Sequence, residues 1–380
     1  MRVLLSLFML LSVVFAEAQE LALFNKDGNW GYINREGKVV ADNFEKAKQF
    51  NDDAAGVMKD GKWGFINRAG DMIIEPQFDN ARDFHAGIAL IHQDGEWKYI
   101  NKQGKILDHF PTKDKVYGFT DNGRAILRDG DKIGIMDTEG NIIVEPQYQE
   151  IKAYKHGYAK VKNDNKWGYI DESGKVVVDI EYIDLGRMRN GVVWGMKKKK
   201  EYGVIKNNKF VVLDGVTDML NFDENGIAPA KKKKKVGHVN GDGEWITEPK
   251  YKAVKGFYDG IAPVREKKTW GYIDMDENWV IKPKYKDAEI FSADGLAPVK
   301  EKKQWGFINK NDEEIIPMKY DITAGDIGGL FAQAFANEER QTKGFVNGLA
   351  RVKTKKGWAF IDTQGNVLGN QWYKNLELFK

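Results

Sequence analysis

The chain has 380 residues and no cysteine, so neither disulfide bonds nor thiolate metal sites contribute to it. A chain of this length does not need disulfides for stability, because a large protein buries a greater fraction of its surface on folding than a small domain does. The formal net charge is only +3, with 59 Lys and Arg against 56 Asp and Glu. This near balance gives no electrostatic reason to expect nucleic acid as a partner.

Motifs for catalysis and for cofactor binding are also missing. The sequence has no Gly-rich phosphate loop and no G-x-S-x-G nucleophile elbow. The five histidines lie in different parts of the chain without metal-ligand spacing, and we interpret His85 and His92 as surface or turn residues. Residues 274–278 begin like a calcium loop, but Trp279 replaces the required glycine. We therefore expect no enzyme, no metal site and no cofactor.

A hydrophobic run opens the chain. Met1 and Arg2 precede an apolar segment from Val3 to Phe15, and the small-x-small sequence of residues 16–18 suits a cleavage site. The run is shorter than the roughly 20 apolar residues of a transmembrane helix. We therefore expect residues 1–18 to be an export signal and residues 19–380 to be the mature chain. That chain would have no transmembrane segment and would lie in the periplasm, at the cell surface or outside the cell.

Glycine and aromatic residues are abundant, and they are arranged in a repeat with a period of about 34 residues. A Trp-Gly anchor, or a variant of it, marks each of ten units, and the last step is lengthened by an insertion at residues 321–343. Trp is the first anchor residue in seven units, and we expect it to be a buried structural anchor there: Trp30, Trp63, Trp97, Trp167, Trp270, Trp305 and Trp358. The other three units have Ile133, Tyr202 and Val236 at this position.

Each unit is predicted to contain three clear strands. The anchor strand, such as residues 62–67, alternates in hydrophobicity and ends in a turn that closes on glycine. The second strand runs to a proline such as Pro76, where it ends or lies at a sheet edge. A third strand of small apolar residues, such as 87–90, precedes the next anchor, and the segment 78–84 between them has room for a short fourth strand.

This pattern resembles the WG-repeat family of bacterial proteins. The resemblance covers residues 21–380 and rests on the motif W-G-[YF]-I-[DN], followed by glycine, two aliphatic residues, proline and an aromatic. Five anchors keep the strict Trp-Gly pair, for example Trp167-Gly168, while others, such as Trp97-Lys98, depart from it. The resemblance implies a β-rich repeat fold and brings no catalytic residues with it.

The predicted fold class is all-β: a tandem array of about ten antiparallel units of three to four strands. One such unit is too small to bury both faces of its sheet, so the units must pack on one another. The array is either propeller-like or an open β-solenoid. In a propeller, we expect the small-residue strand to be innermost and the segment equivalent to 78–84 to be outermost.

Lysine-rich turns distinguish the second half of the array. They join the small-residue strand to the anchor strand, where first-half turns such as 27–29 and 94–96 are neutral or acidic. If equivalent turns share one rim, they form a basic stripe for an anionic polymer. The alternative is that these lysines only solvate hairpins and protect sheet edges. The candidate residues are Lys198, Lys199, Lys232, Lys233, Lys234, Lys267, Lys268, Lys302 and Lys303.

Two further departures from the repeat are candidate sites. Trp245 and Trp279 share one strand position in consecutive units, and they either form an aromatic platform for sugars or vary the local core. The insertion 321–343 has apolar residues at helical spacing, including Phe331 and Phe335, and predicts a short helix. That helix is either a contact for a partner or a cap on the end of the array.

From these observations we expect a non-enzymatic exported protein whose repeats present a binding surface, as a protein-interaction scaffold in the bacterial envelope. The alternative is a module that binds an anionic polysaccharide or another envelope polymer through the lysine-rich turns. The expected partner is accordingly a protein or an anionic envelope polymer.

Overall fold

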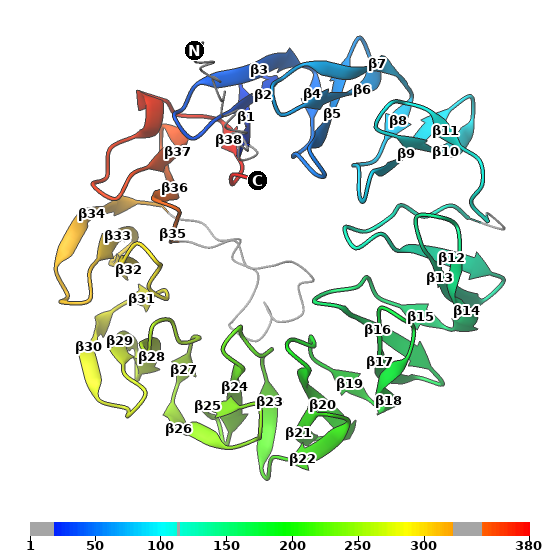
Figure 1. Cartoon of the computed structure of the whole chain (residues 1–380). Helices are drawn as coiled ribbons and strands as arrows, with labels where there is room; N and C mark the ends of the chain where they lie inside the picture. Colours follow the sequence, from blue (N-terminus) through cyan, green and yellow to red (C-terminus); the bar gives the residue numbers. More distant parts are fainter. Residues whose placement is uncertain (1–18, 112–114, 322–343) are drawn as a thin grey trace, which may run out of the picture.

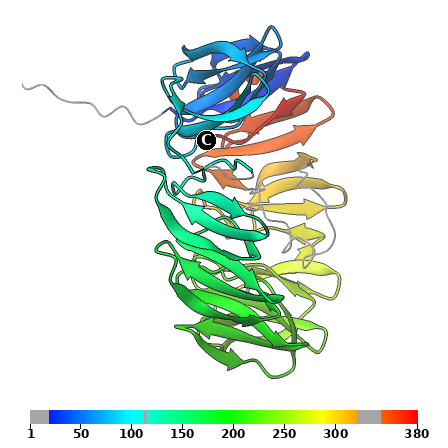
Figure 2. The same cartoon turned by 90° about the vertical axis from the view of Figure 1, so that its right-hand side faces the viewer.

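The chain folds into a closed β-propeller of ten blades in a computed structural model that describes residues 19–111, 115–321 and 344–380 (Figure 1). Seen edge-on, the blades stand side by side around a single ring (Figure 2). Each blade is one small antiparallel sheet. The prediction of an all-β repeat array is therefore confirmed, and the array is a ring.

The first five blades follow the chain in order, and each is named here by its strands. Blade 1 consists of β1 (Ala22–Lys26), β2 (Asn29–Ile33), β3 (Val39–Phe44) and β38 (Asn375–Leu376); blade 2 of β4 (Lys46–Ala47), β5 (Ala54–Lys59), β6 (Lys62–Asn67) and β7 (Met72–Phe78); blade 3 of β8 (Asn80–Ala81), β9 (Ile88–Gln93), β10 (Glu96–Asn101) and β11 (Ile106–Leu107); blade 4 of β12 (Ala125–Asp129), β13 (Lys132–Met136) and β14 (Ile142–Tyr148); blade 5 of β15 (Glu150–Ile151), β16 (Tyr158–Asn163), β17 (Lys166–Asp171) and β18 (Val176–Tyr182).

The remaining five blades complete the ring in the same way. Blade 6 consists of β19 (Asp184–Leu185), β20 (Val192–Lys198), β21 (Glu201–Lys206) and β22 (Lys209–Val212); blade 7 of β23 (Val216–Met219), β24 (Ile227–Lys232), β25 (Lys235–Asn240) and β26 (Trp245–Tyr251); blade 8 of β27 (Ala253–Val254), β28 (Ala262–Glu266), β29 (Thr269–Ile273) and β30 (Trp279–Tyr285); blade 9 of β31 (Asp287–Ala288), β32 (Ala297–Glu301), β33 (Gln304–Ile308) and β34 (Glu314–Tyr320); blade 10 of β35 (Phe345–Val346), β36 (Leu349–Thr354) and β37 (Gly357–Ile361).

The short strand of each four-stranded blade lies at the inner edge of the sheet, nearest the centre of the ring (Figure 1). In blade 3, for example, β8 pairs with the small-residue strand β9, and Asp79 N donates to His92 O. Our expectation that this segment is outermost was wrong. The chain leaves the outer strand of one blade and crosses directly to the inner edge of the next, so the segment belongs to the following sheet.

The two ends of the chain close the ring. The C-terminal strand β38 pairs with β1 and so provides the inner strand of blade 1. The apolar core between blade 10 and blade 1 includes Phe24, whose ring lies 5.1 Å from that of Tyr373. Leu21 N and Lys380 O add a backbone hydrogen bond of 3.1 Å. Closure thus joins segments from opposite ends of the sequence.

The glycine of each Trp-Gly anchor lies under a bulge of the outer strand. In blade 2, Trp63 pairs with Phe78 but Phe65 pairs with Ile74, so the outer strand β7 carries extra residues between these pairs. A Cβ on Gly64 would lie 2.5 Å from the Ile74 carbonyl oxygen, which leaves room for no other residue. Pro76 lies inside this bulge on the outer edge strand, so β7 continues past it to Phe78.

Most core clusters lie between neighbouring blades, as a repeat that cannot fold alone requires. One cluster joins Phe65 of blade 2 to Phe84 of blade 3, with ring centroids 4.7 Å apart. The Trp anchors contribute unequally: Trp63, Trp270 and Trp305 are buried, whereas Trp30, Trp97, Trp167 and Trp358 are half-buried. The four half-buried rings still pack against core clusters between blades, so they contribute less buried surface than the other three.

Three sequence predictions concern residues outside the described ones. These are the export signal at 1–18, the helix that contains Phe331 and Phe335, and most of the insertion 321–343. Within the described ranges, the only helical segment is the short 3-10 helix η2 (Leu368–Asn370). No helix in that part of the chain is long and apolar enough to cross a membrane.

Candidate functional site

The lysine-rich turns lie in equivalent places on consecutive blades. Each joins the second strand of a sheet to the third, and blades that follow one another around a ring in the same sense present such turns on the same face. Seven of the nine predicted lysines lie in blades 6 to 8 and two in blade 9. We call the set the lysine arc: Lys198, Lys199, Lys232, Lys233, Lys234, Lys267, Lys268, Lys302 and Lys303.

The lysine arc is not neutralised by the protein itself. Among the described residues, none of its nine lysines forms an ion pair, although Lys197 beside it pairs with Glu181 at 2.6 Å. Twelve other lysines of the described chain do form such pairs, for example Lys206 with Asp242 at 2.7 Å. All members except Lys232 are exposed. The fold therefore gathers free ammonium groups on one part of one face.

Several lysines of the arc also have an unfavourable backbone conformation. Lys233, Lys234, Lys267 and Lys302 have φ between 45° and 66°. This left-handed conformation costs a residue with a Cβ roughly 1–2 kcal/mol, and turns that require it normally use Asn, Asp or Gly. The equivalent turns of the first half follow that rule, as in Asp60-Gly61. Lysine thus stands where local stability alone favours another residue.

The two predicted tryptophans do not form a joint platform. Trp245, at the start of β26, is half-buried and packs against the core between blades 6 and 7. Trp279, at the start of β30, is exposed and meets the ring of Tyr251 edge-on, with centroids 6.3 Å apart. Between these two described residues no ring contact forms. Trp194, in β20, is buried in the same core.

A second set of polar residues, which the sequence did not reveal, ties five of the blades to the blade that follows. The hydroxyl of Tyr272 in blade 8 donates to the Glu289 carbonyl at the inner edge of blade 9 (2.8 Å). In the same way, the Tyr32 hydroxyl of blade 1 donates to the Lys48 carbonyl of blade 2, and the Tyr99 hydroxyl of blade 3 donates to the Tyr117 carbonyl before β12. His238 takes this place in blade 7, where Nε2 donates to the Lys255 carbonyl at 2.8 Å. Burial lowers the pKa of His238 to about 4, despite the opposing effects of that bond and of Glu277.

Lysines at the inner edge form a similar link. Lys48 of blade 2 donates to the Ala81 carbonyl in the inner strand of blade 3 (2.6 Å). Lys255 of blade 8 donates to the Ala288 carbonyl of blade 9 (2.6 Å) and pairs with Asp287 at 3.2 Å. A basic side chain after one inner strand is thus satisfied by the inner strand of the next blade.

Blade 4 lacks such an inner strand in the described part of the chain. Its sheet begins with β12, and residues 117–119 lie beside this edge without strand pairing; the Tyr117 carbonyl accepts from the Tyr99 hydroxyl of blade 3 at 2.6 Å. Both β12 and these residues line a cavity of about 400 Å³. Apolar walls come from Phe119, Ile126 and Ile135 of blade 4 and Ile151 of blade 5. This cavity lies between blades 3 and 5, and its size is in the range of small-ligand sites.

Basic groups surround the cavity. Arg82, Arg124, Lys48 and Lys152 line it, against the single carboxylate of Asp83. Lys48 pairs with Asp83 at 3.4 Å. Within the described residues, the buried Nε of Arg124 has no hydrogen-bond partner. The cavity therefore favours an anionic ligand.

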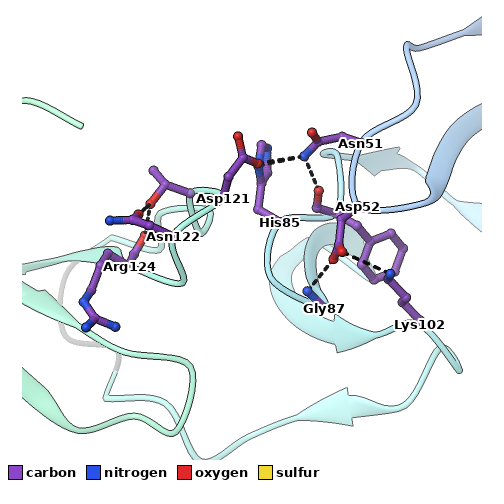
Figure 3. Close-up of polar contacts among 10 residues, drawn as sticks. Asn51, Asp52, His85, Gly87, Lys102, Asp121, Asn122 and Arg124 are labelled. Carbon is purple, nitrogen blue, oxygen red and sulfur yellow. Dashed lines mark hydrogen bonds and ion pairs between the residues drawn. The ribbon is translucent and has the colours of Figure 1, made fainter. Parts of the chain in front are cut away.

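Loops of three consecutive blades meet beside this cavity (Figure 3). Asn51 of blade 2 donates through Nδ2 to the Phe84 carbonyl (2.5 Å) and to Asp121 Oδ1 (3.2 Å). Asp121, from the loop before β12, also lies 2.5 Å from Nδ1 of His85 in blade 3. Burial opposes ionisation of Asp121, but the hydrogen bonds from His85 and Asn51 outweigh it and lower the pKa of this carboxyl.

A second carboxylate completes the arrangement in Figure 3. Asp52 accepts from the backbone N–H of Gly87 (2.5 Å) and pairs with Lys102 at 3.1 Å. These contacts, together with those of Asn51 and His85 to Asp121, hold blades 2, 3 and 4 together beside the cavity. His85 thus lies in a turn as an inter-blade contact, whereas His92 is half-buried in β9 beside Trp97. No group of three His, Asp or Glu side chains in the described ranges has the arrangement of a metal site.

Seven stretches of the sequence match the family described as WG containing repeat: residues 30–63, 63–97, 133–167, 167–200, 237–270, 270–304 and 305–328. Together they cover more than half of the chain. The chain belongs to the WG-repeat family. The WG repeats match blades on both sides of the ring, while residues 98–132, which lead into the incomplete blade 4, fall outside every match.

Solved structures resemble the WG-repeat ring at low sequence identity. A eukaryotic initiation factor structure is 8% identical, with a TM-score of 0.46, and the match covers 79% of this chain and 96% of that one. The computationally designed Ika8 protein is 14% identical (TM-score 0.32; 77% and 98% covered). BamB from Moraxella catarrhalis is 12% identical (TM-score 0.34; 69% and 90% covered). No curated protein sequence matches the chain.

Proposed function

We propose that this WG-repeat ring is a non-enzymatic binding protein that is exported from the cytoplasm and holds an anionic polymer on the lysine arc. The observation that carries the proposal is the unneutralised charge of nine lysines in equivalent turns of four consecutive blades. A polymer with regularly spaced negative charges can contact several turns at once. Each exposed contact is weak, so the avidity of many contacts is required.

The strained turns allow an experiment to distinguish polymer binding from the alternative that the lysines only solvate the hairpins. Lys233 and Lys234 both have positive φ, so Asn and Gly at these positions suit the turn better. We expect the variant Lys233→Asn/Lys234→Gly to be more stable than wild type by about 1 kcal/mol. The same variant loses two ammonium groups and is expected to bind a polyanion less well. A loss of binding together with a gain in stability cannot result from misfolding.

The test is retention on immobilised heparin and on a carboxylated polysaccharide in a rising salt gradient. Wild type should elute late, because exposed charges must be screened before it is released. The variant Lys267→Glu/Lys268→Glu should elute at clearly lower salt. The matched control is Lys59→Glu/Lys132→Glu, which changes the same charge at exposed turn lysines in the other half of the ring. Equal elution of variant and control would refute the lysine arc as the binding surface.

A protein-interaction scaffold is the second candidate function. The cavity beside blade 4 favours it, because its basic lining offers charged contacts to an acidic partner protein. The experiment is a pull-down of the tagged protein from envelope extracts, with and without residues 322–343. Recovery of the same partner by both forms would exclude the insertion as the contact.

A further inference from the structure

We propose that the cavity beside blade 4 binds a small organic anion, whose charged group contacts Arg82 and Arg124 and whose apolar body lies against the core between blades 4 and 5. This site goes beyond the polymer-binding function, because the lysine arc lies in blades 6 to 9. The basic lining would also attract an acidic partner protein, but the volume of about 400 Å³ and the apolar wall fit a small molecule better.

The cavity exists because the segment before β12 does not close the sheet of blade 4. In blade 9, Glu289 N donates to the Pro298 carbonyl and so ties the inner strand to its neighbour. Tyr117 stands at the same register, since its carbonyl accepts from the Tyr99 hydroxyl as the Glu289 carbonyl accepts from a tyrosine of blade 8. Among the described residues, however, no backbone hydrogen bond joins Tyr117 N to Ile126 O. These two segments instead line the cavity together.

Two arginines supply charge that the described chain does not neutralise. Arg82 is exposed, and its guanidinium lies 5.1 Å from the centroid of the Trp97 ring without a hydrogen bond or ion pair to any described residue. A Cβ on Gly118 would lie 4.0 Å from Cδ of Arg82, which places this side chain beside the segment before β12. Nη1 of Arg124 lies 3.4 Å from the Gly123 carbonyl, while its buried Nε has no partner in the described ranges. Guanidinium groups in this state favour an oxyanion.

The other charged groups that line the cavity have partners of their own. Lys48 pairs with Asp83 at 3.4 Å, so the one carboxylate of the lining is compensated. Lys152 pairs with Glu150. The excess positive charge is therefore concentrated on the two arginines, where the charged group of a ligand would compensate it.

The apolar wall belongs to the core of the ring. Ile135 and Ile151 are buried members of the core cluster between blades 4 and 5, and Ile126 packs against that cluster. Phe119 extends the wall towards blade 3, where its ring lies 5.5 Å from that of Tyr99. Contact with this wall favours a ligand that also has apolar surface to bury. The expected ligand is thus a carboxylate on an aromatic or aliphatic body.

The experiment is isothermal titration calorimetry of the full chain with 4-phenylbutyrate, which combines a carboxylate with an apolar body. Saturable binding is expected. The neutral analogue 4-phenylbutanol should bind about tenfold more weakly or worse, because it loses the charge-assisted hydrogen bonds. Acetate, which lacks the apolar body, should also bind at least about tenfold more weakly. Equal binding of the alcohol would refute the role of the arginines, and equal binding of acetate would refute the role of the wall.

Single substitutions locate the site. Arg82→Gln and Arg124→Gln should each weaken the binding of 4-phenylbutyrate about tenfold, whereas Arg124→Lys keeps the charge and should weaken it less. The matched control Lys132→Gln removes one charge from an exposed turn of blade 4 outside the cavity, and it should bind as wild type does. Because Arg82 is exposed, its variant tests the site even if Arg124→Gln does not fold. Wild-type affinity of the Arg82→Gln variant would overturn the proposal.

Two comparisons distinguish failure of this site from failure of the lysine arc. Lys267→Glu/Lys268→Glu should bind 4-phenylbutyrate as wild type does, and Arg82→Gln should keep wild-type retention on heparin. If wild type does not bind 4-phenylbutyrate at millimolar concentration, the small-anion site is refuted, while heparin retention still tests the lysine arc. In that case, a protein that wild type recovers from envelope extracts and Arg82→Gln/Arg124→Gln does not would assign the cavity to a partner protein instead.

Discussion

Acid should destabilise this protein through one buried histidine. His238 is fully buried in blade 7, at the position where most other blades have Tyr or Phe, such as Tyr272. Its Nε2 must carry a proton, because it donates to the Lys255 carbonyl at 2.8 Å, and Nδ1 lies 2.9 Å from the hydroxyl of Thr247. The neutral ring therefore has both nitrogens satisfied. Its ring also packs 4.7 Å from that of Phe257, as Tyr272 packs on Phe291.

The direction of the pH effect follows from the pKa. Burial lowers the pKa of His238 from 6.5 to about 4 in the folded protein. Between these values the unfolded chain binds a proton that the folded chain does not, so stability falls as the pH is lowered through this window. A shift of this size corresponds to about 3 kcal/mol in full, of which about 2 kcal/mol is lost between pH 7.5 and pH 5.

The assay is urea denaturation of wild type and of His238→Tyr at pH 7.5 and pH 5. The variant restores the residue of the other blades, whose hydroxyl can donate to the same carbonyl. It should lose about 2 kcal/mol less than wild type on acidification, because the difference between the two proteins cancels the other titrating groups. His238→Phe, which copies Phe65 and Phe307, should behave in the same way. If both variants show the acid sensitivity of wild type, His238 is not the source of it.

Two further predictions concern the core and the closure of the ring. Trp305→Ala should lower the free energy of unfolding by about 3–5 kcal/mol in urea denaturation, because its indole is buried. Trp167→Ala should cost clearly less, since its half-buried ring lies under Lys160 at 4.5 Å; equal costs would contradict this ranking. Removal of residues 371–380 deletes β38 and exposes the inner edge of β1, so the melting temperature should fall by several degrees. An unchanged melting temperature would show that this pairing does not stabilise the ring.

Much of the fold could be predicted because the same pattern of strands and turns recurs in each repeat unit. The alternation of Trp63-Gly64-Phe65-Ile66 gives the anchor strand, and the glycine-terminated turn after it gives the hairpin. Closure could not be predicted, because it depends on the angle between packed sheets and on a strand pairing of only two residue pairs, Phe24 with Leu376 and Asn25 with Asn375. Such a short strand has no periodicity to reveal it.

The inner strands were misplaced for the same reason. Residues 80–81 adjoin β7 in sequence, and only their pairing with β9 shows that they belong to the next sheet. The lysine arc was found from sequence because its members share a register within the repeat. The cavity of blade 4 was missed, although residues 98–132 carry two signals: a longer step between anchors, and no strand-ending pattern of proline and aromatic such as Pro76 to Phe78.

The basic groups at the cavity of blade 4 are better explained by binding than by stability. At the position of Lys48 and Lys255, the inner strand of the next blade satisfies the ammonium group. Arg82 stands at this position in blade 3 and lies 5.1 Å from the centroid of the Trp97 ring, but among the described residues its side chain has no hydrogen bond or ion pair. Arg124 adds a second guanidinium to the same cavity, and within the described chain its buried Nε has no hydrogen-bond partner. Two basic groups that the described part of the ring satisfies only in part therefore favour an anionic ligand in this cavity.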